Sequence, residues 1–585
     1  MAFQLGRGSV VKMGNRLNPE QRVTDLSALA GQDFDVVVVG GGVTGAGIAL
    51  DAAARGLRTA IIEAQDWAAG TSSASSGLVH GGLRYLYNFD IRLVAEMITE
   101  RGLLLNTLAP HLVRPQTFLW PLHRRILERA GWGAGTSLYD TLGAICGGRC
   151  LPAQRQRSRA GTIARFPDVD PDALVGAIEF HEGFVDDARL VITLIRTALE
   201  YGARAVSRVQ VTRINRSAGG PVTGLTARDL ETGEQVQVRA RGIINATGIW
   251  TEQTAALAQV ASGLRVLAAK GIHLLVPRER IDAAVGIFYR TGTEALYLVP
   301  WQHRWVIGTT DTAWHEPLQY PVPTRTDIDN LLRRANLLLK QPLTRNDLCG
   351  SFAGLRPLLQ PHRGSDVCTS RISRRHTVRT LAPGLVAVAG GKLTTYRRMA
   401  ADAVDALLGR QRTAASPSVT AQTPLLGAQG LEAMTNQSQR IGGIYGWSRT
   451  MMAHLLECYG SELPDLLELV DDSATLAAPL GRAPHHLRVE VARACTAEGA
   501  LHLEDILVRR IRLNREHRDR GLSAMDEVCA IAAPLLGWDA ARIRREKASY
   551  QARVAAEQAA QAEPTDRAAV AIRRKAADAV PTVLG

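Results

Sequence analysis

The sequence predicts an α/β fold in which a parallel-sheet domain is interleaved with an α+β domain and followed by an α-helical C-terminal cap. Three observations predict this fold. Residues 34–62 contain a strand, a glycine-rich turn, a helix and a second strand, in that order. Runs rich in valine, isoleucine and threonine then alternate with helical patterns as far as residue 400. From residue 428 onward the pattern is mostly helical.

The parallel-sheet domain begins with a strand that is expected to be buried on both faces. Residues 34–39 (FDVVVV) form a nearly continuous β-branched run, which is typical of a buried parallel strand. Small, helix-favouring residues follow from 45 to 55, and residues 58–62 (RTAII) form a second strand. This order predicts a βαβ unit. Further strands are expected at 205–213, 222–228, 236–245, 296–309 and 385–389, and helices at 92–108, 187–201 and 326–340.

Domain boundaries follow from changes in composition. A chain of 585 residues is longer than one hydrophobic core usually organises, so two or three domains are expected. The predicted segments are an N-terminal extension (1–33, helical at 19–30), a two-domain body (34–411), a linker (412–427), a helical domain (428–540) and a basic, alanine-rich tail of solvated or partly disordered helices (541–585). Within the body, the interleaved domain occupies roughly residues 100–165 and 250–380.

The charge of the chain favours anionic partners. Lysine and arginine total 69 against 56 acidic residues, which gives a net charge of +13. The positive charges are spread along the chain, and no nucleic-acid motif accompanies them. Nucleic acid is therefore not expected as a partner, whereas a phosphorylated metabolite and an acidic lipid surface are.

Cysteines and apolar runs indicate the compartment. The seven cysteines are an odd number scattered over a long chain, which argues against a disulfide framework and for a reducing environment. Their spacing gives no metal site. No secretory signal is visible at the N-terminus, and no apolar run reaches the length of about 18 residues that spans a bilayer. We therefore expect a cytoplasmic or peripherally attached protein.

The turn after the first strand has the pattern of a dinucleotide-binding site. Gly40, Gly42 and Gly45 fit G-x-G-x-x-G, and Glu63 ends the second strand. The first glycine permits a tight turn, the second lets the backbone approach a pyrophosphate, and the third allows helix and strand to pack closely. The helix N-terminus faces the phosphate charge, and an acid at the end of the second strand can accept hydrogen bonds from ribose.

The segment after the second strand is polar and glycine-rich. Residues 70–86 (GTSSASSGLVHGGLRYL) hold too many serines and glycines for a core element. Such a backbone can wrap closely around a large planar cofactor, but a mobile surface loop explains the composition equally well.

Several motifs together resemble the FAD-dependent glycerol-3-phosphate dehydrogenases. They are, in order, FDVVVVGGGVTGAGIALDAAARGL, TSSASSGLVHGGLRYL, NATGIW, VIGTTD, GLRPLL and GGKLTTYR, and HLEDILVRRIRL at 502–513 resembles the end domain of that family. The resemblance implies a glucose-oxidase-like, Rossmann-type FAD domain, an inserted substrate domain and a helical cap. It also implies oxidation of sn-glycerol 3-phosphate to dihydroxyacetone phosphate.

The resemblance also implies a set of FAD contacts. Gly40, Gly42, Gly45 and Glu63 would hold the adenosine side of the cofactor. The pyrophosphate and the flavin would lie along Ser72, Ser73, Ser76, His80, Gly81, Gly82, Thr247 and Gly248, and the pyrimidine edge of the flavin would be covered by Gly391, Lys392, Leu393 and Thr394.

For the substrate, the resemblance separates phosphate contacts from residues around the reacting carbon. Arg84, Tyr85 and Arg374 match phosphate-binding positions, although Arg371 competes with Arg374 because TSRISRRH allows either alignment. His273, Arg356 and Lys392 match positions around the reacting carbon. The sequence departs from the family pattern at Gly77, Ile249 and Ile272.

These residue types suit the chemistry. Oxidation of a secondary alcohol needs a base for the hydroxyl proton, which His273 can supply, and a fixed donor such as Arg356 near the oxygen. Two guanidinium forks suit a phosphate dianion. A cation such as Lys392 near the flavin N1 and C2 carbonyl would favour hydride acceptance.

The electron acceptor is left open by the residues. Membrane quinone is implied by respiratory members of the family, and oxygen by its oxidase members. The alternatives are therefore an oxygen-using glycerol-3-phosphate oxidase, another amine or hydroxy-acid oxidase of the same fold, and a flavin-binding sensor without turnover. The last would leave the phosphate-binding arginines without a purpose. The oligomeric state, with a homodimer among the options, is also open.

Residues 117–145 are a candidate for contact with the inner membrane. They combine Phe118, Trp120, Trp132 and Tyr139 with Arg124, Arg125 and Arg129, and glycine and charge interrupt them too often for a bilayer span. Aromatic rings suit the headgroup boundary and guanidinium groups suit anionic lipid. A core-packed helix and loop with solvated arginines is the competing interpretation.

Overall fold

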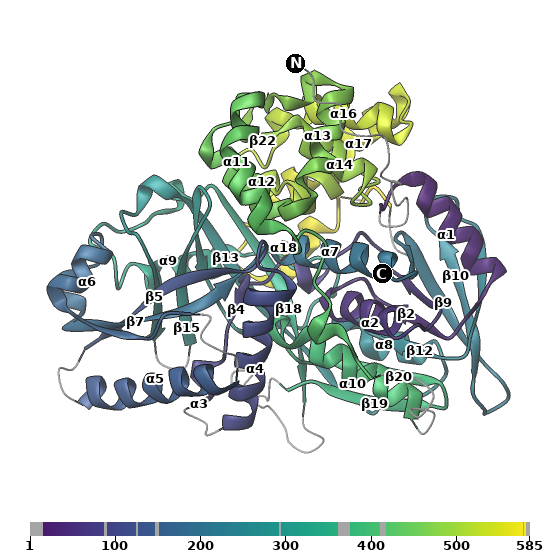
Figure 1. The fold of residues 1–585 in the computed structure, drawn as a ribbon, viewed down its shortest axis with the longest axis horizontal. Helices are drawn as coiled ribbons and strands as arrows, with labels where there is room; N and C mark the ends of the chain where they lie inside the picture. Colours follow the sequence, from purple (N-terminus) through teal and green to yellow (C-terminus); the bar gives the residue numbers. More distant parts are fainter. Residues whose placement is uncertain are drawn as a thin grey trace.

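The computed structural model describes residues 16–86, 90–123, 127–146, 151–291, 294–360, 375–409, 417–576 and 578–580. Figure 1 shows three parts, which we call the dinucleotide domain, the inserted domain and the C-terminal domain. The C-terminal domain lies across the top of the other two, which stand side by side.

A six-stranded sheet forms the centre of the dinucleotide domain. Its order is β19-β20-β12-β2-β3-β8, and all pairs are parallel except β19 with β20. The strands are β2 (Val36–Val39), β3 (Thr59–Ile62), β8 (Arg204–Val206), β12 (Ile243–Asn245), β19 (Thr377–Ala382) and β20 (Leu385–Ala389). The predicted βαβ unit is confirmed, with α2 at Val43–Ala54 between β2 and β3.

Strand β2 is apolar throughout because both of its faces are covered. Val36 and Val38 pack among the helices α2, α7 (Asp187–Glu200) and α10 (Tyr396–Leu408). Val37 and Val39 pack against a second sheet of order β1-β11-β10-β9, formed by Asp33–Phe34, Gln235–Ala240, Val222–Asp229 and Val209–Arg216. Successive side chains of a strand point to opposite faces, so a strand between two layers needs an unbroken apolar run.

Residues 236–245 were expected as one strand, but they form β11 and β12, which belong to different sheets. The chain changes sheet at Gly242, where a Cβ would meet Leu407 of α10 at 2.7 Å. The described part of the N-terminal extension, residues 16–33, lies against the body, with α1 at Pro19–Gly31 and Leu29 buried in the core beneath it.

The inserted domain is built on a ten-stranded sheet. Its main path is β17-β13-β16-β15-β14-β5-β7-β4, with β18 beside β13 and β6 beside β7. The strands are β4 (Leu78–Val79), β5 (Arg114–Leu122), β6 (Arg155–Ser158), β7 (Gly176–Phe184), β13 (Val266–Pro277), β14 (Gly286–Thr291), β15 (Glu294–Trp301), β16 (Arg304–Gly308), β17 (Thr312–Ala313) and β18 (Gly350–Leu359). The sheet therefore takes β4 and β7 from outside the ranges 100–165 and 250–380, so the two domains interleave more closely than expected.

Helices cover both faces of this sheet. On one face α6 (Arg159–Arg165) and α9 (Arg325–Ala335) flank a core that includes Ile272 and Leu274. On the other face lie α3 (Leu83–Leu86), α4 (Ile91–Leu103) and α5 (Leu127–Cys146). The chain passes from β12 through α8 (Thr251–Ala256) into β13, and it returns to the dinucleotide domain between β18 and β19.

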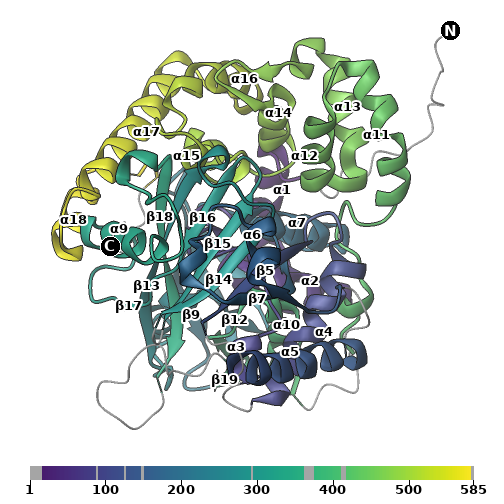
Figure 2. The same ribbon diagram turned by 90° about the vertical axis from the view of Figure 1, so that its left-hand side faces the viewer.

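The C-terminal domain is helical, as predicted. It comprises α11 (Leu431–Tyr445), α12 (Arg449–Tyr459), α13 (Leu463–Asp472), α14 (Arg488–Thr496), α15 (Leu513–Glu516), α16 (Met525–Leu536), α17 (Ala540–Ala560) and α18 (Asp566–Arg573), with a small β21–β22 hairpin at Pro479–Leu480 and Ala483–Leu487. Figure 2 shows α17 descending from this domain and bringing α18 beside α9. Part of the predicted linker also packs firmly, since Leu425 is buried in the core of the dinucleotide domain.

The expectation of a solvated or partly disordered tail beyond residue 540 was wrong for the described part. Tyr550 and Val554 of α17 are buried in the core of the C-terminal domain. Asp566 of α18 pairs with Lys270 of β13, whose side chain is almost fully buried. The tail therefore joins the C-terminal domain to the inserted domain.

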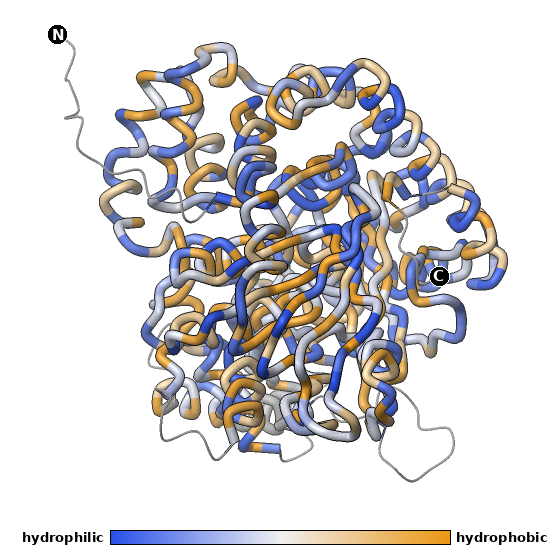
Figure 3. Tube along the Cα trace, turned by 90° about the vertical axis from the view of Figure 1, so that its right-hand side faces the viewer, coloured by the Kyte–Doolittle hydropathy of each residue, from blue (hydrophilic) through white to orange (hydrophobic). Residues whose placement is uncertain are grey.

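No helix among the described residues is long and apolar enough to cross a membrane. In Figure 3 apolar and polar residues interchange along the helices instead of forming one long apolar segment.

Candidate active site

The glycine-rich turn leaves the N-terminus of α2 facing a cavity. Gly40 has φ +111°, and a Cβ on Gly45 would overlap the carbonyl oxygen of Gly40, so the tight turn and the close packing both require glycine. Gly42 is the N-cap of α2 and lines the cavity with Val43. Backbone N–H groups and the helix dipole at this point favour a phosphate.

Glu63 holds the other side of the same turn. Its carboxylate accepts hydrogen bonds from the backbone N–H of Gly41 at 2.5 Å and of Gln65 at 2.7 Å. It lines the cavity at the end of β3, as the pattern predicts for a ribose-binding acid.

The serine-rich segment is an ordered wall of the site and not a surface loop without contacts. Ser72 Oγ accepts from the N–H of Val43 at 2.9 Å, and the carbonyl of Ser73 accepts from Arg512 at 3.0 Å. Ser75 donates to Asp187 at 2.7 Å through its hydroxyl. Each serine thus fixes the segment to a different neighbour.

The opposite wall comes from two distant segments. Thr247 donates its hydroxyl to Asn245 Oδ1 at 2.7 Å, and Gly248 follows with φ +59°. Gly391 has φ +79°, and Thr394 Oγ1 accepts from the N–H of His80 at 3.2 Å. The structure therefore brings most of the predicted cofactor residues to two cavities, although four of them line neither: Gly45, Ser73, Gly81 and Gly82.

Two adjoining cavities form between these walls. The dinucleotide cavity lies between Glu63, the glycine turn and Thr247, with an empty volume of about 1360 Å³. The substrate cavity contains Ser76, His273 and Arg356, with an empty volume of about 1680 Å³. Both are lined by Thr71, Pro357, Gly391, Lys392 and Leu393, so they meet at this point. An elongated ligand can span them.

His273 lies on β13 with its ring toward the substrate cavity, whereas its neighbours Ile272 and Leu274 face the opposite core. Its Nε2 is 2.8 Å from Ser76 Oγ, and its ring stacks on Phe352 with a centroid distance of 4.8 Å. The close approach of Gly308 leaves no room there for a Cβ.

Burial, together with the charges of Arg356 and Arg515, lowers the pKa of His273 to about 3. The imidazole is therefore neutral at physiological pH and can accept a proton. An exposed imidazole titrates near neutrality, whereas burial beside two guanidinium groups disfavours the charged form here.

Arg356 is held in place by the segment 309–311. It donates to the carbonyl of Thr310 at 2.9 Å and to the hydroxyl of Thr309 at 2.6 Å, and it pairs with Asp311 at 3.5 Å. These three residues belong to the VIGTTD motif, to which the sequence alone assigned no role.

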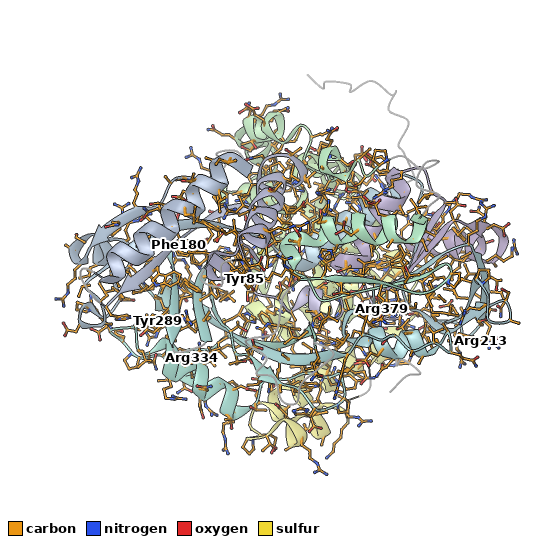
Figure 4. All side chains as sticks on the ribbon, turned by 90° about the horizontal axis from the view of Figure 1, so that it is seen from below. Tyr85, Phe180, Arg213, Tyr289, Arg334 and Arg379 are labelled. Carbon is orange, nitrogen blue, oxygen red and sulfur yellow. The ribbon has the colours of Figure 1, made fainter. Side chains whose placement is uncertain are left out.

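Lys392 and Tyr85 meet where the two cavities join. The Lys392 ammonium lies 3.7 Å from the centroid of the Tyr85 ring. Figure 4 shows Tyr85 between the dinucleotide and inserted domains, with Phe180 farther into the inserted domain.

A buried charged network behind His80–Gly82 was missed by sequence reasoning. Glu182 of β7 lines the substrate cavity and accepts from the N–H of Gly81 at 3.1 Å and from the Tyr139 hydroxyl at 2.7 Å. Arg101 of α4 pairs with the same carboxylate and donates to Tyr139 at 2.8 Å. Burial raises the pKa of Tyr139 well above its usual value, so the phenol stays protonated. The only signal in the sequence was an acidic residue at the end of an apolar strand.

Two of the predicted phosphate contacts cannot be placed. Arg84 lies on α3, but its side chain is outside the described residues, as are Arg374 and Arg371. The roles of these arginines remain predictions.

Three of the aromatic residues expected at a membrane surface lie in the core. Phe118, Trp120 and Tyr139 are buried on the α5 side of the inserted sheet, where Trp120 packs on Phe288 at 4.6 Å. They cannot reach lipid, because Phe118 and Trp120 of β5 and Tyr139 of α5 point into one core between the strand and the helix. The side chains of Trp132, Arg124, Arg125 and Arg129 lie outside the described residues.

Comparison with known proteins agrees with this geometry. Residues 35–397 match the family "FAD dependent oxidoreductase", and residues 418–543 match the "C-terminal domain of alpha-glycerophosphate oxidase". The chain is 46% identical over 568 residues to glycerol-3-phosphate dehydrogenase 2 of Mycobacterium tuberculosis, covering 97% of this chain and 96% of that protein. It is 32% identical over 464 residues to the human mitochondrial glycerol-3-phosphate dehydrogenase, covering 77% and 60%.

A solved structure has a similar fold over most of its length. The glycerol-3-phosphate dehydrogenase of Bacillus halodurans, complexed with FAD, superimposes with a TM-score of 0.74 and 25% identity. The superposition covers 92% of this chain and 98% of that one.

Proposed function

The chain belongs to the family of FAD-dependent glycerol-3-phosphate dehydrogenases, and from this premise we propose that it oxidises sn-glycerol 3-phosphate to dihydroxyacetone phosphate. The observation that carries the proposal is the substrate cavity, in which His273 and Arg356 lie beside the predicted cofactor cradle.

The described residues fit FAD. The turn at Gly40–Gly45 and Glu63 suit its adenosine and pyrophosphate, and the joined cavities accommodate an elongated cofactor. Gly391–Thr394 lie where the cavities meet, so they would contact the ring system. Bound FAD supplies the hydride acceptor, N5 of its ring.

His273 takes the proton of the C2 hydroxyl. Its buried Nδ1 has no hydrogen-bond partner among the described residues, whereas Nε2 meets the hydroxyl of Ser76. Nε2 is therefore the atom that accepts, and Ser76 marks the place where a hydroxyl group can reach it. Removal of this proton pushes electron density toward the C2–H bond that breaks.

Arg356 stabilises the oxygen of the reacting carbon. Its contacts with Thr309 and Thr310 fix the guanidinium before substrate arrives, and its side chain keeps 26% exposure at the cavity. A donor that is already oriented stabilises developing negative charge without reorganising. The phosphate group is assigned to Arg84, Tyr85 and Arg374.

The electrons pass to a quinone at the inner membrane surface. Support comes from the outer face of α5, where Leu138 and Ile145 are 47% and 75% exposed. They are seven residues apart and so share one face of the helix. Contact with anionic lipid would then use this face, and not the buried aromatic residues of β5.

Turnover with an artificial electron-acceptor dye tests the activity. One dihydroxyacetone phosphate should form for every two electrons that the dye receives from sn-glycerol 3-phosphate. Failure to form dihydroxyacetone phosphate while FAD stays bound would refute the proposal. Steady-state rates with a soluble quinone and with oxygen then separate the dehydrogenase from an oxidase.

A further inference from the structure

A third cavity lies between the C-terminal domain and the other two domains. It has an empty volume of about 900 Å³ and is lined by the loop 69–74, strand β18 and residues of α15, α17 and α18. Figure 2 shows α15, α17 and α18 passing around β18. The loop and the strand also line the substrate cavity, so they form the wall between the two spaces. The third cavity shares Gly70, Thr71 and Trp250 with the dinucleotide cavity, but Arg515 lines neither cavity of the proposed oxidation.

Arg515 lines the cavity and is only 7% exposed. Its guanidinium lies 3.9 Å from the ring centroid of Phe352, and no carboxylate or carbonyl group pairs with it in the part of the chain that the structure describes. The nearby Asp186 and Asp187 already bind Arg512. Burial lowers the pKa of Arg515 to about 9, so the side chain is still charged at neutral pH.

The other arginines around the cavity are paired. Arg509 binds Asp66, Arg553 binds Glu504, and Arg573 donates to Asp578 at 3.2 Å. An enclosed charge without a counter-ion is costly, and proteins normally pair such a group or bind an ion with it. The Arg515 guanidinium is therefore a positive charge with which an anion from solution would form an ion pair.

We propose that this cavity is an oxyanion site in which the Arg515 guanidinium binds the phosphate or carboxylate group of a small metabolite. The planar fork of a guanidinium matches either group with two parallel hydrogen bonds. The other three arginines and Glu557 of the cavity are already paired, so the charge of Arg515 is the one that favours an anion. Trp250, Tyr320 and Phe352 add aromatic surface for the rest of the molecule.

The site lies outside the substrate cavity and goes beyond the proposed function. Arg515 does not line the substrate cavity, but Phe352 contacts both its guanidinium and the His273 ring. An anion bound at Arg515 would lie next to Phe352, whose ring stacks on that of the proton acceptor.

Calorimetric titration of the full-length, FAD-loaded protein with inorganic phosphate, and separately with succinate, tests the proposal. The wild type should bind one more oxyanion per chain than Arg515→Met, whatever the substrate cavity binds in both. Arg213→Met is the matched control, because Arg213 is exposed on β9 at the far edge of the dinucleotide domain, as Figure 4 shows. This variant should bind as the wild type does. Phosphate alone would identify a phosphate ester as the ligand class, and succinate alone a carboxylate.

Thermal unfolding provides the second measurement. In anion-free buffer Arg515→Met should unfold at the same temperature as the wild type or above it, because an unpaired buried charge is removed. Phosphate or succinate should raise the unfolding temperature of the wild type, and of Arg515→Lys to a smaller extent, but the extra rise should be lost in Arg515→Met. Equal stoichiometry in wild type and Arg515→Met, or a lower unfolding temperature of Arg515→Met without anion, would overturn the proposal.

Discussion

His273 shows how the surroundings of one residue decide its chemistry. On sequence grounds a histidine among apolar neighbours is usually a core residue, and its ring is indeed almost fully buried. Burial next to Arg356 and Arg515 keeps it neutral, which is the state that a proton acceptor needs. The same burial removes the midpoint near neutrality that an exposed imidazole would have.

Replacement of His273 by Asn should therefore leave bound FAD and substrate affinity nearly unchanged but slow reduction of the flavin about 100- to 10,000-fold, the usual effect of losing a general base. Because the pKa of His273 is lowered to about 3, the wild-type rate should be independent of its ionisation throughout the neutral range and decline only toward strongly acidic pH. Stopped-flow reduction at several pH values measures both. His303→Asn, at a histidine that lines neither cavity, is the control. A His273-dependent midpoint near neutrality would contradict this assignment.

The phosphate contacts give a second prediction at the residue scale. Arg84→Ala and Arg374→Ala should each weaken substrate use by about 2–5 kcal/mol while FAD content stays near normal, because each leaves a buried phosphate charge without its partner. Arg84→Lys should restore only part of the loss, since one ammonium cannot form the fork. Values of kcat/KM measure the effect. If Arg371→Ala is damaging and Arg374→Ala is silent, Arg371 is the phosphate ligand.

At the scale of elements, α4, α5 and β7 support the cofactor loop through one carboxylate. Glu182 joins Gly81, Tyr139 and Arg101, which come from three different elements. Glu182→Met should destabilise the protein by about 3–5 kcal/mol, because it removes the carboxylate that pairs with the buried Arg101. The double variant Glu182→Met, Arg101→Met should recover part of this stability. Denaturant unfolding measures the stability of both variants. Equal stability of the two would mean that the ion pair of Glu182 with Arg101 is not what the single variant loses.

The outer face of α5 carries the membrane prediction. Leu138→Ser with Ile145→Ser should release the protein from anionic liposomes and slow quinone reduction, while reduction of the flavin by substrate stays intact. Val23→Ser, at a residue of α1 that is 67% exposed, is the matched control. Flotation on liposomes at low salt is the measurement. Wild-type protein that does not bind such liposomes would remove the membrane claim and favour an oxygen-using enzyme.

An element could be predicted from the sequence when the pattern that indicates it lies within one short stretch of residues. The glycine turn and β2 were predictable because a tight turn and a doubly covered strand each leave a continuous pattern. The network of Glu182, Arg101 and Tyr139 was not, because its members are 38 to 81 residues apart in sequence and meet only in the fold. The packing of α17 was missed because its buried residues, Tyr550 and Val554, are few among many charged ones.

For the molecule as a whole, buried ion pairs connect the C-terminal domain to the other two. His502 of the C-terminal domain contacts Glu231 at 2.7 Å and Glu546 at 2.9 Å, and these carboxylates raise its pKa to about 9. A raised histidine pKa stabilises the folded state fully below the unfolded pKa of about 6.5, and this stability is lost as the pH rises through about 9.

The unfolding free energy should therefore fall between pH 7 and 9.5, with His502 contributing on the order of 3 kcal/mol of the loss. His502→Gln should be less stable at pH 7 and show a flatter dependence over that range. Chemical unfolding at a series of pH values measures this. A wild-type curve as flat as that of His502→Gln would mean that the buried pairs do not use a charged imidazole.

The central claim is that the two joined cavities bind FAD and sn-glycerol 3-phosphate so that one reduces the other. Anaerobic titration of the purified, FAD-loaded protein tests this most directly, with the flavin absorbance as the readout. One equivalent of sn-glycerol 3-phosphate should bleach the flavin, and glycerol should do so poorly, because the phosphate contacts position the reacting carbon. Flavin that stays oxidised with sn-glycerol 3-phosphate, or that glycerol reduces equally fast, would contradict the account.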